Sequence, residues 1–138
     1  MLEEEDGAYD FAQRIASQIG SKVIRLQAVK TIRRRNNVIN VGAVTPQKFC
    51  GFIKYAKCIV NISFHGTAFS ILYNKPFYTL HSSQEDRAAN LLNLLGLEKR
   101  LVSSSDTVEF SEIDYVESNK VVSILRQKSL NYICQSLE

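Results

Sequence analysis

Residues 58–80, with the sequence CIVNISFHGTAFSILYNKPFYTL, decide the fold. Residues 58–62 are almost uninterruptedly apolar, which is typical of a strand buried on both faces of a sheet. Helical spacing follows over residues 63–72 after a turn at Gly66, and a second apolar run over 77–80 predicts another buried strand. A strand, a helix and a strand of these lengths predict a parallel unit, because the helix carries the chain back over the sheet.

The sequence on either side continues the alternation of helices and short strands. The expected elements are, in chain order, a helix over 7–20 that ends at Gly20, strands over 22–29 and 38–41, a helix starting at Thr45-Pro46, a helix after residue 86 that ends at Gly96, an edge strand over 108–110, and an amphipathic helix over 114–137 that packs back on the domain. This order predicts an α/β fold: a Rossmann-like, doubly wound and mainly parallel sheet in a single domain spanning residues 1–138.

Composition excludes several classes of protein. The 138 residues are 45% hydrophobic and 22% charged, which excludes a disordered chain, and no segment approaches the roughly 20 apolar residues of a transmembrane helix. The formal charge of +3 becomes +7 without the four acids at residues 3–6, and this positive charge suits an anionic small molecule, a nucleic acid or an acidic membrane surface equally well. No nucleic acid is expected as a partner, because the aromatic residues, Phe64, Phe69, Tyr73, Phe77 and Tyr78 among them, lie at core spacing rather than between basic residues.

Cysteine and histidine usage points to a reducing compartment and to no metal. Cys50, Cys58 and Cys134 lie in apolar stretches without a C-x-x-C spacing, which indicates buried thiols. Met1 leads into acids rather than into a signal peptide, so the expected location is the cytoplasm or the inner face of the membrane. The only histidines are His65 and His81, so a zinc site would need an unusual set of ligands, and no metal or cofactor is expected.

Ligands of open parallel sheets bind at the carboxyl ends of the strands. No G-x-G-x-x-G or P-loop is present, but four loops at this edge carry basic and hydroxyl groups. Their residues are Lys30, Arg33, Arg34 and Arg35; Gly42 and Thr45; Ser63 to Thr67; and His81, Ser82, Ser83 and Arg87. Such an edge suits a phosphate or a carboxylate.

Within residues 63–70, SFHGTAFS, His65 is a candidate acid, base or partner of an anion. Gly66 permits close approach of the backbone to a bound anion, and Ser63 or Thr67 can cap the helix or bond an oxyanion. Arg87 offers a planar fork to a carboxylate or phosphate. The alternatives are a structural histidine bonded to neighbouring backbone and a solvated arginine at a helix start.

Several of these segments resemble the polysaccharide pyruvyl transferase family. They are Thr45-Pro46-Gln47-Lys48-Phe49, the Ser63 to Ser70 segment, Asn74-Lys75-Pro76-Phe77, and downstream Arg87, Leu91 to Leu97 and Arg100-Leu101. The resemblance runs from about Gly7 to the C-terminus. It implies a fold similar to glycosyltransferases of the B type, in which two Rossmann-like halves face a cleft. This chain would be the C-terminal, donor-binding half, with the N-terminal domain of the same enzyme as its partner.

The implied activity is that of a transferase in exopolysaccharide biosynthesis, which moves pyruvate from phosphoenolpyruvate to a hydroxyl pair of a saccharide acceptor and makes a ketal. The resemblance assigns His65 a catalytic role and assigns Ser63, Gly66, Thr67 and Arg87 to donor binding. Many family members carry an acidic residue directly before the serine, where this chain has Ile62. Without that carboxylate, His65 is either the acid or only a contact to the donor phosphate.

Two other functions fit the same residues. A nucleotide-sugar glycosyltransferase half would keep the fold and change the donor, and a non-catalytic domain would bind an anion without turnover. A single half is expected to be inactive alone, because no facing domain holds the acceptor and excludes water.

Overall fold

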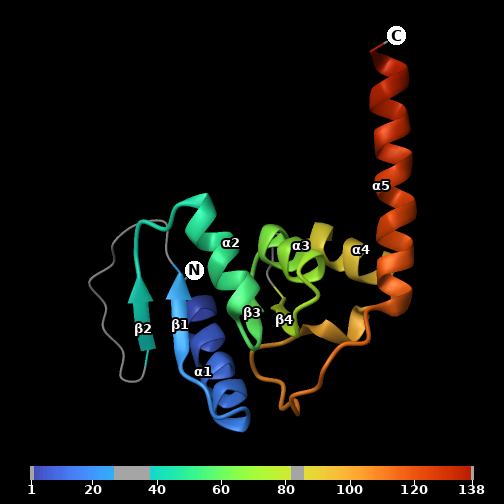
Figure 1. The fold of residues 1–138 in the computed structure, drawn as a ribbon. Helices are drawn as coiled ribbons and strands as arrows, with labels where there is room; N and C mark the ends of the chain where they lie inside the picture. Colours follow the sequence, from blue (N-terminus) through green and yellow to red (C-terminus); the bar gives the residue numbers. More distant parts are fainter. Residues whose placement is uncertain (1, 27–37, 82–85, 138) are drawn as a thin grey trace.

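The computed structural model describes residues 2–26, 38–81 and 86–137. Helices alternate with short parallel strands (Figure 1), which confirms the expected α/β class. The elements are α1 (Leu2–Gln18), β1 (Val23–Leu26), β2 (Val38–Val41), α2 (Pro46–Tyr55), β3 (Ile59–Asn61), α3 (Phe64–Leu72), β4 (Phe77–Leu80), α4 (Asp86–Leu94), the 3-10 helix η1 (Glu98–Arg100), β5 (Leu101–Val102) and α5 (Val116–Ser136).

The parallel strands form two small sheets. β1 pairs with β2, and β3, β4 and β5 pair in that order, with Ile59 opposite Phe77 and Thr79 opposite Leu101. Within the described ranges, no backbone ladder joins β1 to β3. A cleft of about 1410 Å³ lies there instead, lined by side chains of α1, α2, β1 and β3. The strands are parallel as expected, but the described part of the sheet is divided rather than continuous.

Helices cover both faces of the larger sheet. Successive side chains of β4 point to opposite faces, so this strand contributes to a core on each side. Phe77 faces one core cluster, which α2, α3 and α4 complete with Ile53, Ile71 and Leu92. Tyr78 faces the other cluster, on the side of α1, where its ring lies 5.6 Å from that of Phe11 in an edge-on arrangement. All four residues of β4 are buried, which confirms the strand that the apolar run over 77–80 predicts.

The helix boundaries follow from residues that the sequence marks. Thr45 caps α2, its hydroxyl oxygen accepting a hydrogen bond from the Lys48 N–H at 3.4 Å, and Pro46 opens the helix. Gly20 and Gly96 stand just after α1 and α4 with φ of 59° and 67°, a left-handed conformation that glycine adopts without strain.

The expected edge strand over 108–110 is wrong. The nearest strand is β5, which ends at Val102, and residues 108–110 form no strand. Their backbone is bound by the side chain of Gln18 instead. Gln18 donates from Nε2 to the Val108 carbonyl at 2.9 Å and accepts from the Phe110 N–H at 2.6 Å. The amide of Gln18 thus takes the place that a neighbouring strand would occupy.

The prediction that the last helix packs back on the domain is also wrong. The first turns of α5 touch the core through Val121 and Val122, but the helix then runs away from the body (Figure 1). Tyr132 and Ile133 are 73% and 52% exposed. Cys134 lies on this exposed part, so it is not the buried thiol expected from its apolar surroundings.

Cys50 and Cys58 are half-buried free thiols. Across residues 2–26, 38–81 and 86–137, no helix has the length and apolar character needed to cross a membrane.

Candidate functional site

The candidate site is built where β3 ends and α3 begins. Ser63 is the N-cap of α3, in an extended conformation, and its hydroxyl oxygen accepts a hydrogen bond from the Gly66 N–H at 3.1 Å. The N–H groups of Phe64 and His65 belong to the first turn, so they have no acceptor within the helix. The positive end of the α3 dipole therefore lies at the carboxyl end of the sheet, as the parallel arrangement predicts.

A buried polar network supports this helix start from below. Asn61 Oδ1, at the end of β3, accepts from the Ser63 N–H at 3.3 Å and from the Thr67 hydroxyl at 3.1 Å. The Thr67 hydroxyl also lies 2.8 Å from that of Thr79 in β4 and is fully buried. Any contribution of Thr67 to a donor site therefore comes through its support of the α3 N-terminus.

Gly66 is in the helix rather than at a turn before it, and close packing explains why the position is a glycine. A Cβ there would lie 2.7 Å from Cβ and 2.9 Å from Cγ of Asn61. The residue lets α3 approach the end of β3, whereas the sequence suggested an approach of the backbone to a bound anion.

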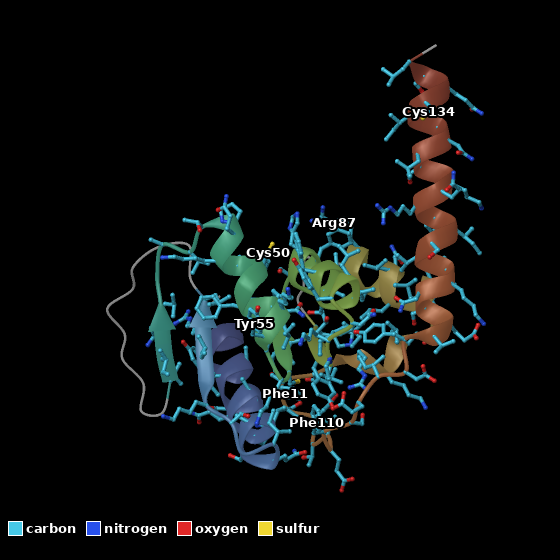
Figure 2. The ribbon with its side chains drawn as sticks, viewed as in Figure 1. Phe11, Cys50, Tyr55, Arg87, Phe110 and Cys134 are labelled. Atoms are coloured by element: carbon cyan, nitrogen blue, oxygen red, sulfur yellow. The ribbon has the colours of Figure 1, made fainter. Side chains whose placement is uncertain are left out.

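Three side chains from two helices gather outside the N-terminus of α3. The guanidinium carbon of Arg87, from the first turn of α4, lies 5.3 Å from the centre of the Phe64 ring, within cation–π range. The His65 ring lies 5.8 Å from the same Phe64 ring, at an interplanar angle of 77°. Arg87 and His65 are exposed, and Figure 2 shows Arg87 beside α3. Phe64 is thus a neighbour of each of the two residues that the sequence singled out.

The cleft between the two sheets reaches this place. Asn61, Ser63 and Gly66 belong to its lining, together with basic residues from β1 and α2, Arg25 and Lys48. The remaining lining is mainly apolar, from residues such as Ile15, Ile19 and Phe52. A ligand bound at the start of α3 would therefore lie next to this cleft.

The other residues expected at this edge are placed as follows. His81 follows β4, and its N–H donates to the Val102 carbonyl at 2.9 Å. Thr45 follows β2 in the smaller sheet, and its hydroxyl caps α2. The remaining expected contributors lie outside the described residues: Lys30, Arg33, Arg34, Arg35, Ser82 and Ser83.

Two side chains, Cys58 and Tyr115, have strongly raised pKa values. Burial raises the pKa of the Cys58 thiol to about 11, so this side chain is uncharged at neutral pH. Burial also raises the pKa of Tyr115, whose hydroxyl donates to the Lys75 carbonyl at 2.6 Å. In the described part of the chain, no group of three or more metal-binding side chains gathers.

Sequence reasoning missed Asn61 and Phe64. Asn61 carried a signal, since it is the polar end of an otherwise apolar strand and precedes the capping serine by two residues. Phe64 was interpreted as a core aromatic from its spacing; it is half-buried, and only the docking of α4 on α3 gives it Arg87 as a neighbour.

Comparison with known proteins gives one result. A sequence model described as polysaccharide pyruvyl transferase matches residues 1–83. The matched range contains the SFHGTAFS and Asn74-Lys75-Pro76-Phe77 segments, but it ends before Arg87, so the similarity is narrower than the expected Gly7 to C-terminus. Searches among curated proteins and among solved structures found no match.

Proposed function

The chain belongs to the polysaccharide pyruvyl transferase family, and from this premise we propose that it binds phosphoenolpyruvate at the carboxyl ends of β3 and β4. The observation that carries the proposal is the contact of Arg87 and His65 with one Phe64 ring, beside the N-terminus of α3. Cationic and N–H donors from two helices suit a ligand that carries both a phosphate and a carboxylate.

Each residue has a part in this proposal. Arg87 pairs with one anionic group of the donor through its planar fork. His65 contacts the donor phosphate or supplies a proton, and the N–H groups of Phe64 and His65 face the second anionic group. Ser63 and Gly66 set the direction of the helix start, and Thr67 fixes it from inside.

The proposed reaction adds two sugar hydroxyls to the donor carbon. A proton adds to the methylene carbon of phosphoenolpyruvate, and the oxygen of one hydroxyl bonds to C2. The oxygen of the second hydroxyl then displaces the phosphate, whose C2–O bond breaks. One hydroxyl proton replaces the one that made the methyl group, and the other leaves on the phosphate. In this proposal His65 is the group that transfers the proton.

The chain would serve as the C-terminal, donor-binding half of a two-domain enzyme of surface polysaccharide synthesis. A facing domain would hold the saccharide and exclude water, so the 138-residue chain alone is expected to bind the donor without transferring pyruvate. The free cysteines suit a reducing compartment, which supports a place in the cytoplasm or at the inner face of the membrane.

Calorimetric titration of the chain with phosphoenolpyruvate tests the proposal. Inorganic phosphate and a nucleoside diphosphate serve as comparison ligands. Arg87→Ala is expected to weaken phosphoenolpyruvate binding about tenfold or more, since a charge-assisted hydrogen bond contributes about 1.5–3 kcal/mol. Arg126→Ala, which removes an exposed arginine of α5, is the matched control and is expected to bind like the unchanged chain.

The comparison ligands separate the rival functions. Binding of the nucleoside diphosphate without phosphoenolpyruvate would replace the proposal with a nucleotide-sugar transferase half. Equal binding of phosphate and phosphoenolpyruvate would favour a simple anion-binding domain. In an enzyme with the acceptor domain, pyruvate transfer by His65→Ala at the parental rate would remove His65 from the mechanism.

A further inference from the structure

We propose that Phe64 is a positioning residue of the donor site, whose ring holds the Arg87 guanidinium of α4 at the first turn of α3. The inference rests on the proposed function, because it concerns how that same site is organised. Phe64 would not touch the donor's reacting atoms; it acts through Arg87.

The geometry supports this role. The Phe64 ring has the guanidinium carbon of Arg87 at 5.3 Å and the His65 ring at 5.8 Å, so it is the shared neighbour of both candidate donor contacts. Phe64 is the first residue of α3 and Arg87 the second of α4, so the contact joins the first turns of two helices. A cation held there is next to the N–H groups that α3 leaves without intrahelical partners.

An aromatic ring does here what another apolar side chain would not. Arg87 is exposed, and each group that contacts its guanidinium reduces the number of rotamers open to the side chain. A ring face attracts the guanidinium and restricts it to fewer of these rotamers. Part of the side-chain entropy that Arg87 would otherwise lose when the donor binds is then already lost on folding.

A core role alone does not account for Phe64. The ring is half-buried, whereas Phe77 and Phe11 are fully buried in the two core clusters. Phe69, five residues along the same helix, gives the contrast: it packs edge-on against Phe49 of α2, with ring centres 5.5 Å apart. Phe69 therefore provides a matched control for loss of an aromatic ring from α3.

The test compares Phe64→Met and Phe64→Leu, which keep apolar bulk without a ring face, with Phe64→Tyr, which keeps the ring. Phosphoenolpyruvate affinity of the full chain is measured by calorimetry. Met and Leu are expected to weaken binding about three- to fivefold, the size of an exposed cation–π contact, and Tyr is expected to retain it. Phe69→Leu is expected to leave the affinity unchanged. Unchanged affinity in Phe64→Met or Phe64→Leu would overturn the inference.

A spectroscopic reading separates failure of the inference from failure of the proposed function. In the unchanged protein, the ring current of Phe64 is expected to shift the Arg87 Nε–Hε NMR signal away from the position of the exposed Arg126 signal. This reading needs neither a ligand nor a folded variant. Coincident Arg87 and Arg126 signals would overturn the inference. A shifted Arg87 signal without any phosphoenolpyruvate binding would overturn the proposed function and leave the contact itself established.

Discussion

Replacing Gly66 by alanine tests the account of the α3 N-terminus through stability. The added Cβ would lie 2.7 Å from Asn61 Cβ, an atom next to the backbone that cannot swing aside. Alanine improves helix propensity by about 0.5–1 kcal/mol, whereas overpacking of this kind costs about 1–3 kcal/mol. The clash outweighs the propensity, so Gly66→Ala is expected to lower the free energy of unfolding by about 1–2 kcal/mol.

Gly51→Ala is the matched control, because Gly51 also lies within a helix but has nothing within 4 Å of the added Cβ. That variant is expected to raise the free energy of unfolding by about 0.5–1 kcal/mol through propensity alone. Urea unfolding monitored by circular dichroism gives both values on one scale. If Gly66→Ala proved as stable as Gly51→Ala, the close approach of α3 to Asn61 would be refuted.

Three further perturbations test other parts of the structure. The folded-state pKa of Cys58 is raised from 9.0 to about 11, so its contribution to stability is complete below about pH 9 and lost as the pH rises towards 11; urea midpoints between pH 8 and 10 are expected to fall less in Cys58→Ala than in the parent. Arg100→Met is expected to cost about 2–3 kcal/mol, because the buried guanidinium donates to the carbonyls of Ser111 and Glu112, and a loss below about 1 kcal/mol in urea unfolding would contradict this. Removing residues 129–138 is expected to change the free energy of unfolding by less than about 0.5 kcal/mol, since the described side chains there are exposed; a larger loss would show that this part of α5 packs on the body.

The central part of the fold was predictable because its signals are local. The apolar run over 77–80 is the strand β4 to the residue, and Thr45-Pro46 marks the start of α2. Gly20 and Gly96 follow the helices that they were expected to end. In each case neighbouring residues supply both the pattern and its cause, so the tertiary structure had little to override.

The wrong predictions concern contacts between distant segments. Apolar residues occur all around α5, with Leu130 and Ile133 on one side and Ile124 and Tyr132 on another, so periodicity does not select a face to bury. The backbone of residues 108–110 has apolar side chains that suit a strand, yet the side chain of Gln18 binds it. Nothing near residues 108–110 indicates a partner 90 positions earlier.

In the candidate site, too, the local features were predictable and the contacts between distant segments were not. The capping role of Ser63 follows from the short SFHGT segment, whereas the packing of Gly66 against Asn61 depends on how α3 lies on β3. The meeting of Arg87 with Phe64 depends on how α4 docks on α3, which no local pattern contains. The sequence therefore indicated the candidate charged residues His65 and Arg87 at this edge, but it did not indicate the contact of Arg87 with the Phe64 ring.

The division of the strands has a mechanical consequence. β3, β4 and β5 are tied by backbone ladders, so the framework beneath His65 and Arg87 resists deformation. Between β1 and β3 no such ladder is described, so widening or narrowing that seam would break no strand pairing among the described residues and would act on the packing of α1 against both strands. A conformational change would therefore be easiest at the seam between β1 and β3, next to the sheet of β3, β4 and β5 that carries the proposed site.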